Sequence, residues 1–413
     1  MNVVVAIDSL KGSLTSLEAG KAISEGIKKV MPDAQIEVRP LADGGEGTVE
    51  ALALGMHGRL ENVTVTGPLG EQVSAAYGIL DETSMQEAED RIIAGTQVQD
   101  RTGMEKGRSM CEGGGRTAII EMSAAAGITL VTEEERNPMY TTTYGVGEMI
   151  KDAIQKGCRH FIVGIGGSAT NDGGIGMLQA LGYGILDKDG KQVSYGAQGL
   201  NEIEKITDEY VIPELKECTF RVACDVTNTL CGEQGCSAIF GPQKGATPTM
   251  IMQMDKWLAY FAALSREKYP QANMNQAGTG AAGGLGFAFL TYTNAVLESG
   301  IKIVLEETRL EEYVKDADIV VTGEGRLDGQ TAFGKAPIGV AEIAKKYGKK
   351  VIAFSGCVTE DAAVCNEHGI DAFFPILRGV VTLEEAMNAE NARENMIATV
   401  EQVFRLIDAY NQR

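Results

Sequence analysis

Glycine-rich turns placed directly after apolar strands constrain the fold of this chain more than any other feature. The longest of them, at residues 164–176, follows an apolar run and opens a helical pattern. A turn of this kind presents backbone N–H groups and a helix N-terminus, and both favour an anion. Glycine accounts for 51 of 413 residues, about 12% against a usual value near 7%. Because proline is scarce, the clustering indicates tight backbone turns rather than low complexity.

Both ends of the chain predict a parallel, doubly wound sheet. Apolar runs at about 3–7 and 36–41 are each followed by a helical pattern. The same alternation returns at about 319–322, 351–355 and 372–376. Strands that alternate with helices form βαβ units, which build parallel sheets covered by helices on both faces.

The middle of the chain predicts a different arrangement of strands. Residues 59–80 resemble a hairpin around a Gly-Pro-Leu-Gly turn, which favours a mixed or antiparallel sheet. Further strands are expected at about 118–122, 161–164 and 220–225. We therefore predict one α/β domain formed by residues 1–60 and 286–413, interrupted by a second α/β domain at 61–285, with a crevice between the two.

Residues 81–115 form an unusual hydrophilic insertion with almost no strand pattern. Connections of this length are usually functional or mobile. Two interpretations stay open: a solvated excursion or partly disordered loop, or a lid over the crevice.

Composition excludes several classes of function. The formal net charge of -20 repels nucleic acid and anionic lipid, and we find no local basic patch. No apolar run approaches a membrane span and no leader pattern precedes the first strand, so a cytoplasmic protein is expected. The eight cysteines contain no C-x-x-C pair and the three histidines are isolated. Zinc sites, disulfide frameworks and histidine-activated nucleophiles are therefore disfavoured.

Acidic residues follow several of the predicted strands. A D-G-G-x-G element occurs twice, beginning at Asp43 and Asp172, and each aspartate could serve as a helix cap or as a ligand. Asp8, Asp43 and Glu324 all lie just beyond strands of the same predicted sheet. Since open α/β sheets bind ligands at the carboxyl ends of their strands, this convergence predicts a site.

Basic residues accompany these acids. Lys11 lies near a helix start, and residues 322–330 combine two acids with Arg326. Residues 329–335 read G-x-x-x-x-G-K, but the Ser or Thr that would bind Mg²⁺ is missing, so we exclude a true P-loop and keep Lys335 as a phosphate contact. A phosphate cradle, Mg²⁺ ligands, a cation and an orienting carboxylate are what phosphoryl transfer requires.

In order along the chain, these motifs resemble the bacterial glycerate kinase family, which phosphorylates D-glycerate with ATP. The matching blocks are 8–14, 42–48, 137–145, 164–176, 223–228, 240–246, 278–284, 322–330 and 334–337. The resemblance implies a flavodoxin-like domain made of both chain ends, an inserted second domain, and phosphorylation in the interdomain cleft. The chain departs from the family pattern at 81–115.

The resemblance also implies a product, most simply 2-phosphoglycerate from transfer to the 2-hydroxyl. Transfer giving 3-phosphoglycerate and a kinase of another small hydroxy acid stay open as alternatives. A non-catalytic nucleotide sensor would keep the glycines but could dispense with the carboxylates, which this chain retains. The expected small molecules are D-glycerate, ATP and Mg²⁺, without nucleic acid or membrane partners, and the oligomeric state is left open, a homo-oligomer included.

These considerations assign expected roles to individual residues. The catalytic set is Asp172, Asp225, Lys11, Glu324 and Arg326. The ATP-binding set is Gly166, Gly167, Ser168, Thr170, Asn171, Gly283, Gly284 and Lys335. Glycerate is expected to contact Asp8, Ser9, Asp43, Glu46 and Lys244, and the metal is expected to bind Asp225, Glu324 and Asp328.

Overall fold

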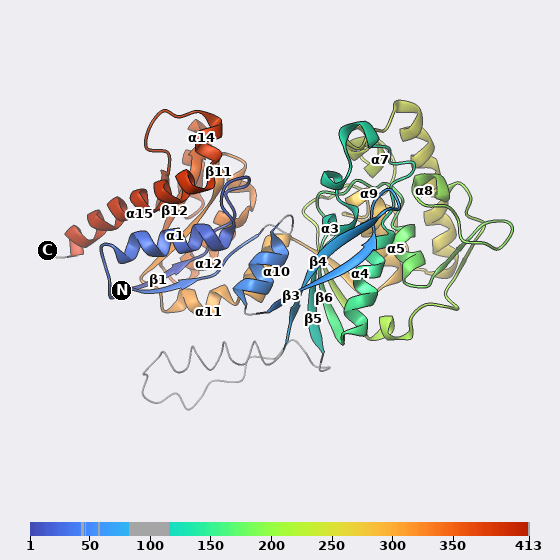
Figure 1. Ribbon diagram of the computed structural model, residues 1–413, viewed down its shortest axis with the longest axis horizontal. Coiled ribbons are helices and arrows are strands. Elements are labelled where there is room, and N and C mark those ends of the chain that lie inside the picture. The colour runs from blue at the N-terminus through green and yellow to red at the C-terminus, as the bar shows by residue number, and fades with distance from the viewer. Residues whose placement is uncertain (43–44, 46, 57, 82–114, 412–413) are drawn as a thin grey trace. The chain divides into compact units, whose positions relative to one another are not determined.

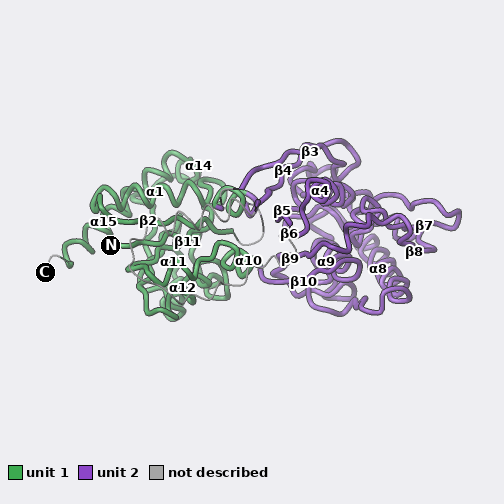
Figure 2. The backbone as a smooth tube through the Cα atoms, turned by 90° about the horizontal axis from the view of Figure 1, so that it is seen from below, with its two compact units in different colours: residues 1–43, 50–55, 300–413 green, residues 44–49, 56–299 purple. Residues whose placement is uncertain are grey.

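The computed structural model describes residues 1–42, 45, 47–56, 58–81 and 115–411 (Figure 1). The chain divides into two compact units (Figure 2). Unit 1 comprises Met1–Asp43, Glu50–Gly55 and Gly300–Arg413, and unit 2 comprises Gly44–Val49 and Met56–Ser299. Among the helices in the described ranges, none combines the length and apolar character needed to cross a bilayer.

Unit 1 contains a five-stranded parallel sheet. Its strands, in spatial order, are β13 (Ala372–Pro375), β12 (Lys350–Val358), β11 (Ile319–Leu327), β1 (Asn2–Val5) and β2 (Gln35–Val38). Every neighbouring pair is parallel. Chain order therefore reverses between β1 and β11, which is the flavodoxin-like strand order. The predicted fold of this part is confirmed.

Helices cover both faces of this sheet. On one face lie α1 (Ser16–Lys28) and α15 (Ala389–Asn411), whose apolar sides share a core with alternate residues of the strands, such as Val3 and Val5. Helix α1 begins at a capping box formed by Thr15 and Glu18. The unit also contains α10 (Gly300–Glu307), α11 (Leu310–Lys315), α12 (Ala336–Lys346) and the short helices α13 (Val364–Glu367) and α14 (Leu383–Met387). Helix α12 packs on β11 and β12.

Unit 2 contains a six-stranded mixed sheet, as predicted. Its spatial order is β10 (Ala295–Glu298), β9 (Thr219–Ala223), β6 (Cys158–Gly164), β5 (Arg116–Glu121), β4 (Gln72–Leu80) and β3 (Arg59–Thr66). The first four strands are mutually parallel, and β4 and β3 continue the sheet in antiparallel pairing. A small separate pair joins β7 (Gly184–Leu186) to β8 (Lys205–Thr207).

The core of unit 2 is built from the sheet and its longer helices. These helices are α4 (Tyr144–Gln155), α8 (Pro248–Lys268) and α9 (Ala281–Tyr292), with shorter segments including α3 (Ser123–Ala126), α5 (Ile175–Ala180), α6 (Ala197–Leu200) and α7 (Cys236–Phe240). Phe161 stacks on Phe220 with ring centroids 4.7 Å apart, and Phe289 extends the aromatic contact from α9. This packing holds α9 against the centre of the sheet.

The structure differs from the sequence-based expectations in one edge strand and one domain boundary, and most of the predicted insertion is not described. The sequence patterns did not predict β10, a four-residue edge strand. The expected boundary at 285/286 lies inside α9, and unit 2 contains the whole of that helix. The hydrophilic insertion lies outside the described residues over 82–114, between two strands that pair directly, since Leu80 is opposite Thr117.

Candidate active site

A candidate site lies at the carboxyl edge of the unit 1 sheet, where β1 is next to β11. Open α/β sheets bind ligands where strand order reverses, and it reverses at this pair. The loop after β1 is held closely against β11, because the Asp8 N–H donates to the Gly323 carbonyl at 3.0 Å. The two segments approach closely here, because a Cβ added to Gly325 would lie 3.3 Å from the backbone nitrogen of Lys11. Five residues predicted from the sequence share this edge: Asp8, Ser9, Lys11, Glu324 and Arg326.

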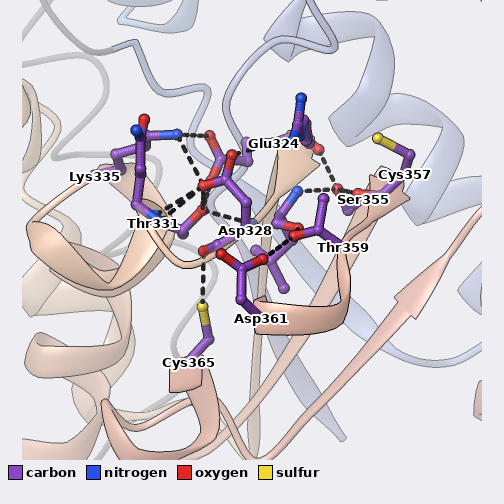
Figure 3. Close-up of polar contacts among 12 residues, drawn as sticks. Glu324, Asp328, Thr331, Lys335, Ser355, Cys357, Thr359, Asp361 and Cys365 are labelled. Atoms are coloured by element: carbon purple, nitrogen blue, oxygen red, sulfur yellow. Dashed lines mark hydrogen bonds and ion pairs between the residues drawn. The ribbon is translucent and has the colours of Figure 1, made fainter. Parts of the chain in front are cut away.

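A group of charged and hydroxyl side chains continues from this edge (Figure 3). We call Glu324, Arg326, Asp328, Thr331 and Lys335 the acid–cation cluster. The Thr331 hydroxyl donates to Glu324 Oε1 at 2.5 Å. Lys335 Nζ lies 3.7 Å from Glu324 Oε2 and 3.6 Å from Asp328 Oδ1, and Arg326 Nε lies 3.5 Å from Asp328 Oδ2. Two carboxylates and two cations are thus within ion-pairing distance.

Local turn chemistry builds the cluster. Asp328 Oδ1 accepts hydrogen bonds from the backbone N–H groups of Gln330 and Thr331, at 3.0 and 3.2 Å. This Asx turn starts the short 3₁₀ helix Thr331–Phe333, which ends at Gly334 with φ +93°. Lys335 is then the N-cap of α12, with a proline in the first turn. The 3₁₀ helix separates β11 from α12, which agrees with the exclusion of a P-loop.

Burial sets the electrostatics of Glu324. Burial raises the pKa of the Glu324 carboxyl, while the Thr331 hydrogen bond and the charge of Lys335 act in the opposite direction. The Glu324 side chain is 13% exposed, whereas that of Arg326 is 65% exposed. The cluster therefore combines a shielded carboxylate with a solvent-facing cation, an arrangement able to bind an anionic ligand beside a proton or metal acceptor.

In unit 2, the glycine-rich loop leads from β6 to α5 at the corresponding edge of the other sheet. Gly166 and Gly167 are the exposed residues of the loop, and Gly167 needs the left-handed region, with φ +70°. Ser168, Thr170 and Asn171 are buried, the last two completely. The part of the loop that a phosphate can reach is therefore backbone at Gly166 and Gly167.

Asp172 lies beneath this loop and is fully buried. Its carboxylate accepts hydrogen bonds from the Thr143 N–H at 2.9 Å, the Thr143 hydroxyl at 2.8 Å, the Gly174 N–H at 3.0 Å and the Gly176 N–H at 3.4 Å. Burial raises the pKa of Asp172, and these hydrogen bonds act in the opposite direction. The contacts give Asp172 a part in holding the loop, and its catalytic role stays a prediction.

Lys244 also lies beneath the loop, with 2% of its surface exposed. Its ammonium donates to the Ser168 hydroxyl at 2.7 Å and to the Thr170 carbonyl at 2.6 Å. Burial lowers the pKa of Lys244 to about 8. Lys244 therefore fixes the glycine loop from below and places a positive charge under it.

Gly283 and Gly284 support the same loop from the start of α9. Their φ angles are +66° and +95°, and a Cβ on Gly283 would lie 2.1 Å from the Thr170 carbonyl oxygen. The Gly173 N–H donates to the Gly283 carbonyl at 2.9 Å. Both glycines are required by close packing of backbone on backbone, and their contact with ATP stays a prediction. Asp225 follows β9 and is exposed.

The sequence-based prediction missed two residues at these edges. Glu121 ends β5, and its Oε1 accepts the Val49 N–H at 2.9 Å. The same short segment approaches the glycine loop, since a Cβ on Gly166 would lie 3.6 Å from the Gly45 Cα. The position of Glu121 after an apolar strand was a usable signal, whereas nothing in the sequence distinguished the second missed residue, Thr331.

The predicted residues thus fall into two groups, one in each unit. Unit 1 holds Asp8, Ser9, Lys11, Glu324, Arg326, Asp328 and Lys335; unit 2 holds Gly166, Gly167, Ser168, Thr170, Asn171, Asp172, Asp225, Lys244, Gly283 and Gly284. Asp43 and Glu46 lie outside the described residues. Over the described ranges, no group of three or more His, Cys, Asp or Glu residues could hold a metal ion, so the metal ligands stay a prediction.

A flavodoxin-like sheet with charged side chains at its switch point, together with a glycine-rich strand-to-helix loop, is typical of α/β enzymes that act on small anionic molecules. Comparison with known proteins specifies the class. Residues 3–408 match the model of the Glycerate kinase family. The chain belongs to this family, as the motifs indicated, and it is an enzyme, a kinase.

Individual relatives are similar over almost their whole length. The glycerate kinase of Haemophilus influenzae is 46% identical over 98% of this chain and 99% of its own. The glycerate 2-kinase of Escherichia coli is 44% identical over 97% of this chain and 98% of its own. A crystal structure from Salmonella typhimurium LT2, provisionally assigned as glycerate kinase 2, matches with a TM-score of 0.85 and 43% identity over all of both chains.

Proposed function

We propose that this enzyme transfers the γ-phosphoryl group of ATP to the 2-hydroxyl of D-glycerate, giving 2-phosphoglycerate and ADP. Family membership supports the reaction, and the Escherichia coli relative, 44% identical, is named a glycerate 2-kinase. The structural observation that carries the proposal is the acid–cation cluster at the switch point of the unit 1 sheet. Such a cluster can bind an anionic acceptor and orient its hydroxyl.

The unit 1 residues supply side-chain chemistry. Lys11, Arg326 and Lys335 offer cations to the glycerate carboxylate and to the phosphoryl group, with Asp8 and Ser9 beside them on the same edge. Glu324 supplies a shielded carboxylate, either to the metal or to the acceptor hydroxyl as general base. A Mg²⁺ titration of Glu324→Gln separates the two roles: a lost ligand raises the Mg²⁺ requirement, while a lost base lowers kcat at saturating Mg²⁺.

The unit 2 residues supply a backbone cradle. Gly166 and Gly167 present their backbone to the ATP phosphates, and Lys244 contributes positive charge from beneath. Asp225 offers an exposed carboxylate at the end of β9, while Asp172 holds the loop through its four hydrogen bonds. Both groups of residues contribute to the same reaction in this proposal.

The residues present fit Mg²⁺. Carboxylate oxygens are its preferred protein ligands, and it commonly binds one or two of them together with substrate phosphates. Glu324 Oε2 lies 3.7 Å from Lys335 Nζ, and Asp328 Oδ2 lies 3.5 Å from Arg326 Nε. Ion pairs of this length are loose enough for either oxygen to change partner. Glu324 and Asp328 would hold the ion in unit 1, and Asp225 is the ligand predicted from unit 2. When bound, Mg²⁺ neutralises charge on the phosphate oxygens.

A coupled assay tests the proposal. The enzyme is incubated with ATP, Mg²⁺ and D-glycerate, and enolase is then added without a phosphoglycerate mutase. Immediate phosphoenolpyruvate is the expected result, because enolase uses the 2-phosphate. Phosphoenolpyruvate that forms only after mutase is added would instead assign the 3-phosphate.

Control reactions distinguish the remaining alternatives. ADP release with another small hydroxy acid, and none with D-glycerate, would keep the kinase chemistry and change the acceptor. No ADP release with any acceptor, despite ATP binding, would support a nucleotide sensor and overturn the proposal. A cytoplasmic location stays a prediction.

A further inference from the structure

Thr331 lies at the centre of the acid–cation cluster and has no role in the assignments above. It is the first residue of the 3₁₀ helix Thr331–Phe333, and it is fully buried. Its hydroxyl meets three polar atoms: Glu324 Oε1 at 2.5 Å, the Asp328 backbone nitrogen at 3.1 Å and Asp328 Oδ1 at 3.4 Å. Figure 3 shows the side chain between the two carboxylates.

The directions of these hydrogen bonds follow from the groups involved. A hydroxyl has one proton to donate and two lone pairs to accept with. The Asp328 N–H can only donate, so it occupies a lone pair of the Thr331 oxygen. The single proton goes to Glu324 Oε1, because 2.5 Å is a strong charge-assisted distance and 3.4 Å to Asp328 is not. Thr331 therefore connects the Asx turn at Asp328 to a single oxygen of Glu324, Oε1.

The ion pair of Glu324 with Lys335 is looser than its hydrogen bond with Thr331. Lys335 Nζ is 3.7 Å from Oε2, and its side chain is 39% exposed. The charges of Lys11 and Asp328 also act on the pKa of Glu324. The Thr331 bond ties Oε1 to the protein and leaves Oε2 toward the cations.

We propose that Thr331 is a positioning residue that holds Glu324 in its reactive orientation by occupying Oε1. The inference rests on the proposed function, because it requires Glu324 to take part in the reaction. Carboxylate orientation matters for catalysis, since misplacement by about 1 Å can cost on the order of 10²-fold in rate. The loss is expected in kcat at saturating Mg²⁺, because the proposed cradle for the ATP phosphates is the backbone of Gly166 and Gly167 in unit 2.

The first experiment compares Thr331→Val with Thr331→Ser. Valine keeps the branched shape and removes the hydroxyl, and serine restores the hydroxyl. We expect valine to lower kcat by about 10- to 100-fold with KM for ATP changed by less than about threefold, and serine to recover most of kcat. Equal losses in both variants, or full kcat in the valine variant, would overturn the inference.

Thr308→Val is the matched control for loss of a buried hydroxyl. Thr308 lies in the same unit, is 2% exposed, and donates only to main-chain carbonyls, that of Val304 at 2.8 Å being the nearer. Its valine variant should lose a similar amount of thermal stability and keep kcat. A fall in kcat as large as that of Thr331→Val would assign the effect to stability and overturn the inference.

A double-mutant cycle separates this inference from the proposed function. If Thr331 acts through Glu324, adding Thr331→Val to Glu324→Gln should lower kcat by less than about twofold further. Additive losses would overturn the positioning role while leaving Glu324 in the reaction. Near-normal kcat in Glu324→Gln alone would instead contradict the assignment of Glu324 within the proposed function.

Discussion

The carboxyl edges of the two sheets offer different groups to an anionic ligand. In unit 1 the edge carries charged side chains with partly exposed, loosely paired ends, as in Arg326, Lys335 and Glu324. In unit 2 the exposed part of the loop after β6 is glycine backbone, and the charged groups Asp172 and Lys244 are buried beneath that loop with hydrogen bonds made, while Asp225 is exposed after β9. Side-chain chemistry and backbone support are thus separated between two similar edges.

The comparison shows why two acidic residues predicted at sheet edges need not share a role. Asp172 is a fully buried anchor of the loop that leads from β6 to α5. Glu324 lies within the last part of β11, and its Oε2 is 3.7 Å from the Lys335 ammonium. Burial, which a motif does not reveal, decides between structural and chemical use of a carboxylate.

Among these predictions, Asp225→Asn should lower kcat the most. A large fall would indicate that unit 2 also contributes one reactive carboxylate. We expect kcat to fall by about 10²–10³-fold, as on loss of a group that stabilises the transition state, with a much smaller change in KM. Steady-state ADP release measures both constants. Near-normal turnover would remove Asp225 from catalysis and make the contrast between the two edges complete.

Asp172→Asn tests the structural side of the comparison. The amide NH₂ would face N–H and O–H donors in a fully buried site, so we expect the free energy of unfolding to fall by about 2–3 kcal/mol. Urea denaturation measures the loss. A variant of normal stability with no activity would restore the catalytic role predicted from the sequence.

Gly167→Ala tests whether the exposed glycine backbone binds ATP. Alanine at φ +70° costs about 1–2 kcal/mol and displaces the loop, so KM for ATP should rise by about tenfold. Gly190→Ala is the control: it has a similar φ of +75°, and a Cβ there meets nothing within 4 Å. Equal KM values in the two variants would contradict a cradle at Gly167.

The smallest predicted effect is a pH dependence of folding stability that is due to Lys244. Its folded-state pKa of about 8 lies below the unfolded value of 10.5, so between these values the unfolded chain binds more protons. Stability should therefore rise with pH over this window in the wild type, by on the order of 1 kcal/mol per pH unit, relative to Lys244→Met. An identical pH dependence in both proteins would show that burial does not lower the pKa of Lys244.

The fold could be predicted largely from the sequence, because apolar strand runs and helical spacing are local signals. The strands at both chain ends and the hairpin at β3 and β4 were located within a few residues. The edge strand β10 was missed because four residues with a mixed pattern resemble a loop. The predicted division at 286 fell inside α9, since a glycine-rich start looks like a linker when its packing is unknown.

The site was only partly predictable, for a different physical reason. Residues that follow strands could be assigned to sheet edges, which located Asp8 and Asp225. Glu324 was expected just beyond a strand, but β11 is longer than predicted and contains it. Burial of Thr170 and Asn171, and the hydroxyl of Thr331 between two carboxylates, depend on tertiary packing that no spacing encodes.

The most direct test of the account is the turnover number of Glu324→Gln, measured on a preparation whose melting temperature is recorded. The account predicts that kcat falls by about 10²-fold or more while the melting temperature stays near that of the wild type. A variant that turns over D-glycerate at a rate close to the wild-type enzyme would contradict the claim that the charged edge of unit 1 carries out the chemistry.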